Sequence, residues 1–142
     1  MWVLALIFEG IPLRMLFVDD SKVTRAVMGQ LLRFHGHEVF TAAGVEEAKS
    51  LLAGEVLDMV ITDFQMPGGD GLSLARWVRE HEPIAKLPIL LVTADFDPDH
   101  TTVARAAGVD HFIEKTFSPE DMAEAIETAG IRLTEEKKER ER

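Results

Sequence analysis

The sequence predicts an α/β fold in which a parallel β-sheet is covered by helices on both faces. Short apolar segments alternate with longer segments of helical period along the whole chain, and such alternation is typical of parallel sheets with right-handed crossovers. Several of the apolar segments have few polar positions, as expected for strands that are buried on both sides. A length of 142 residues fits one domain with its own hydrophobic core.

Five segments are predicted to be strands because they are short and rich in Val, Ile, Leu or Phe. The first, third and fourth are almost continuously apolar, which favours a position inside the sheet. In chain order they are residues 14–18, 38–42, 57–62, 87–93 and 110–114.

Helices are predicted between the strands and after the last one. In the first helical segment Val23, Val27 and Leu31 recur every four residues, and Gly36 follows where a helix commonly ends in a left-handed residue. The later helices are predicted to begin near Val45, Gly71, Asp99 and Ser118.

The composition excludes several classes of function. With 15 Lys and Arg against 25 Asp and Glu, the net charge is −10, which repels nucleic acids and anionic lipids. We therefore expect neither nucleic acid nor a membrane as a direct partner. The chain has no Cys, so disulfides, thiolate nucleophiles and Cys-ligated zinc are excluded, and a reducing cytoplasmic location suits it.

The two ends of the chain differ from its middle. Residues 1–12 contain an apolar run that is too short to span a bilayer and lacks the features of a secretory signal. We expect this segment to be an N-terminal extension, either an added strand or disordered. Residues 131–142 mix acidic and basic side chains and are expected to form a charged tail, either a frayed helix or part of a linker. One domain at 13–130 lies between them.

Polar side chains stand at the carboxyl ends of four predicted strands. Asp19 and Asp20 follow the first strand, Asp63 follows the third, Thr93 ends the fourth, and Lys115 follows the fifth. Parallel sheets bind ligands beyond this edge, where the strand order reverses. We therefore expect three carboxylates, one hydroxyl and one ammonium group to meet there.

Such a group of side chains suits Mg²⁺ and a phosphoryl group. Neighbouring carboxylates repel one another and need a cation, and a donor set made of oxygen atoms suits Mg²⁺. The ammonium group of Lys115 and the hydroxyl group of Thr93 can hold phosphoryl oxygens. A carboxylate can itself accept the phosphoryl group and form an aspartyl phosphate.

Each of these residues, taken singly, also has a structural explanation. Asp20 or Ser21 suits a helix N-cap, and Asp63 suits the end of a strand before a turn. Thr93 is an ordinary strand residue, and Lys115 an ordinary surface charge. Their joint occurrence at the ends of four strands favours a functional site.

The remaining motifs are weaker. His35 and His37 flank Gly36, the other three His are scattered, and no spacing typical of a metal site is present. We interpret the histidines as surface or turn residues. The glycine-rich segment 66–71 lacks the Lys-Ser/Thr pair of a phosphate-binding loop and is predicted to be a turn into a helix.

Four motifs carry a resemblance to a known family. They are residues 16–21 (LFVDDS), 60–67 (VITDFQMP) with 70–71 (DG), 91–94 (LVTA) and 112–115 (FIEK). In these motifs the chain resembles the receiver domain of two-component response regulators, in particular the single-domain chemotaxis-type form, over about residues 13–130. The resemblance implies a flavodoxin-like (βα)5 fold, a doubly wound parallel sheet with strand order 2-1-3-4-5.

The resemblance also implies roles for the acidic residues. Asp63 is expected to be the phosphoacceptor, and Asp20 and Asp63 to bind Mg²⁺ directly. Asp19 would act through a water molecule, and the backbone carbonyl of Gln65 would complete the protein ligands. Gln65 and Asp95 lie beside the site and would tune the lifetime of the phosphoryl group.

A second set of residues is implied to bind the phosphoryl oxygens and to signal its presence. Thr93, the backbone amide of Ala94 and Lys115 would hold the oxygens. Phe112 would swing inward as Thr93 moves. This movement would alter the face made by the fourth helix, the fifth strand and the fifth helix, which serves for output and for homodimer formation.

The function expected from the resemblance is a phosphorylation-activated signalling switch. A histidine kinase or a phosphotransfer protein donates the phosphoryl group to Asp63 in the presence of Mg²⁺, and a downstream protein recognises the altered surface. The chain is expected to be a cytoplasmic phosphoprotein that assists its own phosphorylation and dephosphorylation, and not an enzyme with a separate substrate.

Two alternatives remain at this point. A small-molecule phosphatase that forms an aspartyl phosphate would need an Asp-x-Asp motif and a substrate-covering cap, and the chain lacks the motif and the length for a sizeable cap. A receiver-like binding module that is not phosphorylated is kept open by Thr116, since the family usually has Pro there after a cis bond. The Lys115–Thr116 loop is then either trans and differently shaped, or strained.

Overall fold

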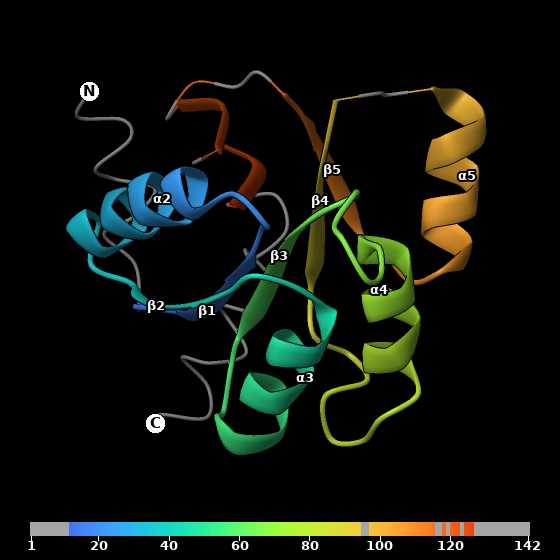
Figure 1. Cartoon of the computed structure of the whole chain (residues 1–142), viewed down its shortest axis with the longest axis horizontal. Coiled ribbons are helices and arrows are strands. Elements are labelled where there is room, and N and C mark those ends of the chain that lie inside the picture. The colour runs from blue at the N-terminus through green and yellow to red at the C-terminus, as the bar shows by residue number, and fades with distance from the viewer. Residues whose placement is uncertain (1–11, 95–96, 116–117, 119, 123, 127–142) are drawn as a thin grey trace.

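The computed structural model describes residues 12–94, 97–115, 118, 120–122 and 124–126. Five parallel strands form one sheet in the order β2-β1-β3-β4-β5 (Figure 1). They are β1 (Arg14–Val18), β2 (Glu38–Ala42), β3 (Met59–Asp63), β4 (Ile89–Thr93) and β5 (His111–Glu114). The predicted α/β fold and its strand order are confirmed.

Helices follow the strands and cover both faces of the sheet (Figure 1). The labelled helices are α2 (Lys22–Phe34), α3 (Val45–Gly54), α4 (Gly71–Arg79) and α5 (Pro98–Ala106). Residues 120–122 and 124–126 are also helical. Among the described residues, none of the helices has both the length and the apolar character that crossing a bilayer requires.

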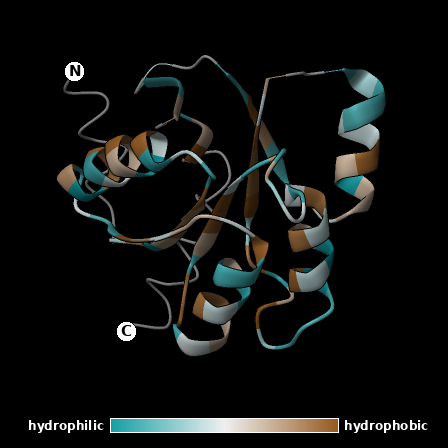
Figure 2. Ribbon diagram, in the orientation of Figure 1, coloured by the Kyte–Doolittle hydropathy of each residue, from teal (hydrophilic) through white to brown (hydrophobic). Residues whose placement is uncertain are grey.

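Two hydrophobic cores lie on opposite faces of the sheet, because successive side chains of a strand point to opposite sides. Met15 and Phe17 of β1 pack into the core under α2 and the helical residues Met122 and Ile126. Leu16 and Val18 pack into the core under α3, α4 and α5. Figure 2 shows the strands as mainly hydrophobic and the helices as mixed.

Helix α2 lies where it was predicted, but the spacing that predicted it does not mark its buried face. Val23 and Val27 are 72% and 59% exposed, whereas Met28 and Leu32 are buried against the sheet. The helix begins at the N-cap Ser21, whose side chain accepts a hydrogen bond from the Thr24 amide at 3.2 Å.

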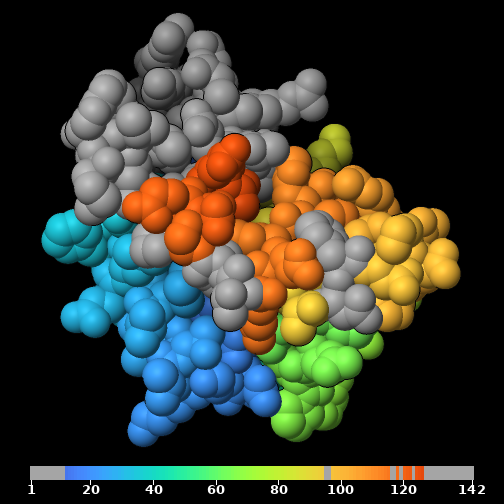
Figure 3. All heavy atoms as spheres, turned by 90° about the horizontal axis from the view of Figure 1, so that it is seen from above, coloured from blue at the N-terminus to red at the C-terminus, as the bar shows by residue number. Residues whose placement is uncertain are grey.

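Strand register brings the carboxyl ends of the inner strands to the same edge. Val18 pairs with Thr62, and Asp63 pairs with Val92. After β3 the chain turns sharply into α4, and the Gly71 amide donates to the Phe64 carbonyl at 2.7 Å. Viewed from above (Figure 3), the segments that follow β1, β3, β4 and β5 lie side by side, in blue, green, yellow and orange.

Candidate functional site

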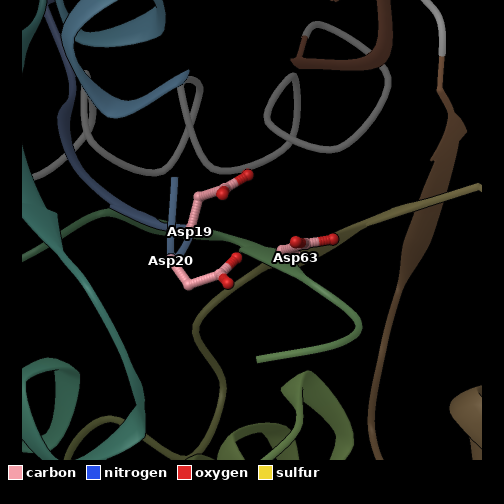
Figure 4. A group of neighbouring side chains, drawn as sticks. All are labelled: Asp19, Asp20 and Asp63. Carbon is pink, nitrogen blue, oxygen red and sulfur yellow. The ribbon is translucent and has the colours of Figure 1, made fainter. Parts of the chain in front are cut away.

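Three carboxylates meet at this edge of the sheet (Figure 4). Asp19 and Asp20 follow β1, and Asp63 ends β3. One oxygen of each lies within 4.8 Å of the others. Asp19 and Asp63 are buried, at 2% and 7% exposure, while Asp20 is exposed. The cluster therefore reaches solvent through Asp20, while its other two carboxylates are buried. The three negative charges repel one another.

Local hydrogen bonds hold the carboxylates of Asp19 and Asp63 in place. Oδ1 of Asp19 accepts from the Ser21 amide at 2.8 Å, and the Asp19 carbonyl accepts from the Arg25 guanidinium at 2.7 Å. Oδ1 of Asp63 accepts from the Phe64 amide at 2.9 Å. The start of α2 and the turn after β3 thus orient the acidic side chains.

Lys115 brings positive charge to the carboxylates of the cluster. The Nζ atom of Lys115 lies 3.3 Å from Oδ1 of Asp63 and 4.0 Å from Oδ2 of Asp19. The Lys115 amide donates to the Thr93 carbonyl at 2.8 Å, which fixes the segment after β5 to the end of β4. The peptide bond to Thr116, on which the sequence raised a question, lies outside the described residues, as does Asp95.

The environment disfavours a negative charge on Asp63. Burial raises the pKa of the Asp63 carboxyl group above its usual value, and the neighbouring Asp19 raises it further. Lys115 and the Phe64 amide lower the same pKa, but their effect is smaller than that of burial and repulsion together. A cation placed among the carboxylates would relieve this penalty.

A cavity of about 240 Å³ opens beside Asp63. Its lining residues, among those that the structure describes, are Asp63, Phe64, Gln65, Thr93, Ala94, His100 and Lys115. Thr93 is 7% exposed, whereas Gln65 and Ala94 are exposed. The structure thus brings a hydroxyl, an amide and an ammonium group next to one carboxylate.

Phe112 lies on β5 and is not among the described residues that line this cavity. It is half-buried on β5, and the guanidinium group of Arg105 from α5 lies 4.9 Å from the centre of its ring. Phe112 also packs against the core under α3, α4 and α5. It therefore connects the sheet edge to the exposed side of α5.

His37 differs from the sequence interpretation, whereas His100 agrees with it but also lines the cavity. His100, taken as a surface or turn residue, is exposed but lines the cavity from α5. His37 is buried at 8% exposure, and its Nδ1 atom accepts a hydrogen bond from the Leu13 amide at 3.0 Å. Both placements depend on contacts between segments far apart in the chain, which a local pattern does not reveal.

The donor set decides which cation suits the cluster. Carboxylate oxygens within 4.8 Å of one another and partial exposure fit a hard divalent cation that keeps some of its water, as Mg²⁺ does. The cluster contains neither imidazole nor thiolate, which the softer transition metals prefer. The residues present therefore fit Mg²⁺.

Comparison with known proteins gives a consistent result. Residues 15–127 match the response regulator receiver domain family. The chain is 35% identical to the chemotaxis protein CheY of Pseudomonas aeruginosa, over 81% of this chain and 94% of that protein. It is also 35% identical to the gliding motility regulatory protein of Myxococcus xanthus, but there it spans only 15% of the relative.

Solved structures agree with this match. The chemotaxis protein CheY4 of Vibrio cholerae has a TM-score of 0.81 at 29% identity, over 83% of this chain and 98% of that one. A putative response regulator from Chloroflexus aurantiacus has a TM-score of 0.76 at 34% identity, over 83% and 97%. The chain spans about half the length of some transcriptional regulators it also matches, such as GltR of Pseudomonas aeruginosa at 46%.

Proposed function

This chain belongs to the response regulator receiver family of two-component signalling, and from that membership we propose that it is a switch activated by phosphorylation of Asp63. The observation that carries the proposal is the surroundings of this carboxylate. The Lys115 ammonium group lies 3.3 Å from it, and two further carboxylates lie within 4.8 Å. A cavity large enough for a phosphoryl group opens beside it.

The donor is a histidine kinase or a phosphotransfer protein. A carboxylate oxygen of Asp63 attacks phosphorus, the phosphorus–nitrogen bond to the donor breaks, and its electron pair returns to the donor. The Lys115 ammonium group, the Thr93 hydroxyl group and the Ala94 amide line the cavity and would hold the phosphoryl oxygens. Each contributes a hydrogen-bond donor where negative charge accumulates.

Bound Mg²⁺ would neutralise charge on the phosphoryl oxygens. Asp20 and Asp63 would hold it directly, Asp19 through a water molecule, and Gln65 through its backbone carbonyl. Gln65 lines the cavity with an exposed side chain, which supports the proposal that it also tunes the lifetime of the phosphoryl group. We propose the same for Asp95, which lies outside the described residues.

Phosphorylation is proposed to be communicated through Thr93 and Phe112. Thr93 would move toward the phosphoryl group, and Phe112 would turn inward into the space it leaves. Phe112 now lies under Arg105 of α5, so its movement would alter the face formed by α5, β5 and the helical residues 120–122 and 124–126. A downstream protein or a second copy of the chain would recognise that face.

Helix α2 offers a surface for the phosphodonor protein. It begins beside the acidic cluster, and its exposed residues Val23 and Val27 lie on the side away from the sheet. Its basic residues include Lys22 and Arg25, and it contains no acidic residue, in a chain of net charge −10. An apolar helix face bordered by acidic side chains would complement this surface and lie next to Asp63.

We place the receiver domain at residues 13–130, between the N-terminal extension 1–12 and the charged tail 131–142. The described core spans most of this range. A cytoplasmic location fits a chain without Cys, and a net charge of −10 argues against direct contact with nucleic acid or an anionic membrane.

The proposal is tested by labelling the full chain with phosphoramidate and Mg²⁺ and measuring the added mass. We expect one phosphoryl group on the parent and none on Asp63→Asn. Asp70→Asn is the matched control, because Asp70 caps α4 through the Ser73 amide at 2.8 Å, and Asn preserves such a cap. Labelling of Asp63→Asn at the parent level contradicts the proposal. Mg²⁺ binding without labelling of the parent identifies a binding module instead.

A further inference from the structure

The cavity beside Asp63 has one wall that comes from a helix. Six of its described lining residues follow or end strands β3, β4 and β5, whereas His100 belongs to the first turn of α5. The imidazole ring therefore faces the same space as the carboxylate of Asp63 and the ammonium group of Lys115. His100 is itself exposed to solvent.

His100 lies in a first helical turn that is well defined by its own contacts. Asp97 is the N-cap of α5, and Pro98 is its first residue. The Thr101 hydroxyl group donates to the Pro98 carbonyl at 2.8 Å, which closes the first turn. The ring of His100 lies 6.3 Å from the ring of Phe64, with an angle of 39° between them. Because Phe64 directly follows Asp63, the imidazole ring lies near the backbone that carries the phosphoacceptor.

The chemistry of the lining groups separates their roles. The Lys115 ammonium group can only donate hydrogen bonds, so it suits phosphoryl oxygens. Thr93 is buried at the end of β4. In the proposed function its hydroxyl group donates a hydrogen bond to the same phosphoryl oxygens. Hydrolysis also requires a group that accepts a hydrogen bond from the attacking water. Gln65 and His100 can both do so, and His100 is the one whose ring contacts Phe64.

We propose that His100 is a positioning residue that accepts a hydrogen bond from the water that hydrolyses the aspartyl phosphate. The water oxygen forms a bond to phosphorus while the bond between phosphorus and the Asp63 oxygen breaks. The electron pair of that bond returns to the carboxylate, and both protons of the water leave on dihydrogen phosphate. His100 thereby shortens the lifetime of the phosphorylated state. This inference rests on the proposed function of Asp63.

The experiment measures the decay of the phosphoryl group on the full chain, after labelling with phosphoramidate and Mg²⁺ and removal of the donor. His100→Gln keeps a hydrogen-bond acceptor, whereas His100→Phe keeps a ring beside Phe64 but no acceptor. We expect His100→Phe to lengthen the half-life about fivefold, the effect of one lost hydrogen bond in the transition state. His100→Gln should stay within about twofold of the parent on the same basis. His100→Leu repeats the test without an aromatic ring and should resemble His100→Phe.

A matched control is His81, another exposed histidine, which lies just beyond the end of α4 and stacks on Trp77. His81→Phe should leave the decay unchanged. Decay of His100→Phe at the parent rate or faster would show that the ring is only a wall of the cavity and would overturn the inference. Equal slowing by Gln and Phe would overturn it too, because the acceptor would then be irrelevant. A parent chain that takes no label on Asp63 would instead refute the proposed function itself.

Discussion

Replacing Asp63 with Asn should make the cation-free protein more stable at neutral pH. The pKa of Asp63 is raised, first by burial and then by Asp19, so the folded state binds a proton at this site more tightly than the unfolded state does. The stability gained from that proton is present below the unfolded pKa and is lost as the pH rises through the folded pKa. Asn carries no charge and avoids this loss.

The size of the effect follows from the distances. At 4.8 Å and an effective dielectric of 20, one carboxylate pair repels by about 3.5 kcal/mol. Repulsion from Asp19 is then about 3.5 kcal/mol, against about 5 kcal/mol of attraction from Lys115 at 3.3 Å, and burial of Asp63, the largest cause of its raised pKa, turns the balance against the charge. Exposure of 37% of the Lys115 side chain weakens the attraction. A net gain of about 1–2 kcal/mol is expected for Asp63→Asn, the order found when an unfavourably buried charge is removed.

The assay is urea unfolding of parent and Asp63→Asn with EDTA, at a series of pH values from 4 to 8. Linear extrapolation gives the free energy of unfolding, and the difference between the two proteins isolates Asp63 because all other groups are shared. The advantage of the variant should grow as the pH rises and then reach a plateau. Added Mg²⁺ should stabilise the parent more than the variant, because ligand binding to the folded state adds to its stability.

A variant that is less stable than the parent in EDTA at pH 7.5 would refute this reasoning. It would mean that the attraction between Asp63 and Lys115 outweighs burial and repulsion. A stability difference that does not change with pH would refute it as well, since the effect would then come from packing and not from the charge of Asp63.

Three further predictions address other parts of the site. Lys115→Met should lower the rate of labelling by phosphoramidate about 100-fold while Mg²⁺ binding, followed by calorimetry, persists; labelling at the parent rate would contradict the role of its ammonium group. Gly71→Ala should cost about 1–3 kcal/mol in urea unfolding, because a Cβ atom there would collide with the Asp63 carbonyl; an unchanged midpoint would disprove this. Val27→Asp should slow transfer from the protein donor about fivefold to tenfold but not from phosphoramidate, whereas Val56→Asp, at a position that is also exposed, should slow neither.

The fold could be predicted from local patterns and from the joint occurrence of polar residues at several strand ends. Alternation of apolar and helical segments sufficed for a parallel sheet, and polar residues at strand ends sufficed to bring Asp19, Asp20 and Asp63 together. Strand boundaries were less accurate: β3 begins at Met59 and includes Asp63, and β4 begins at Ile89. In both cases the prediction included apolar residues that precede the strand pairing, because hydropathy does not distinguish a buried loop from a strand.

The buried face of α2 could not be predicted from its period. Val23 and Val27 are four residues apart, and so are Met28 and Leu32. Both pairs fit a helix equally well, and they point in different directions because five residues separate Val23 from Met28. Packing against β1 and β3 buries the second pair and leaves the first exposed.

The place of His100 beside the cavity was not predicted from the sequence. The start of its helix was predicted near Asp99, and α5 begins at Pro98 after the N-cap Asp97, so this start was predicted to within one residue. The Asp97–Pro98 pair is a recognisable start signal, so the correct start was available in the sequence, but the contact of His100 with Phe64 required the assembled fold.

The negative charges that lower the stability of the folded protein are the ones that the proposed chemistry of the site requires. The carboxylate of Asp63 is buried and lies close enough to Asp19 to share a cation with it, and both conditions raise its pKa. The two cores on either side of the sheet hold these side chains together despite the repulsion. Asp63→Asn should therefore be more stable and unable to accept a phosphoryl group, which is the trade-off expected where function and stability make opposite demands on one residue.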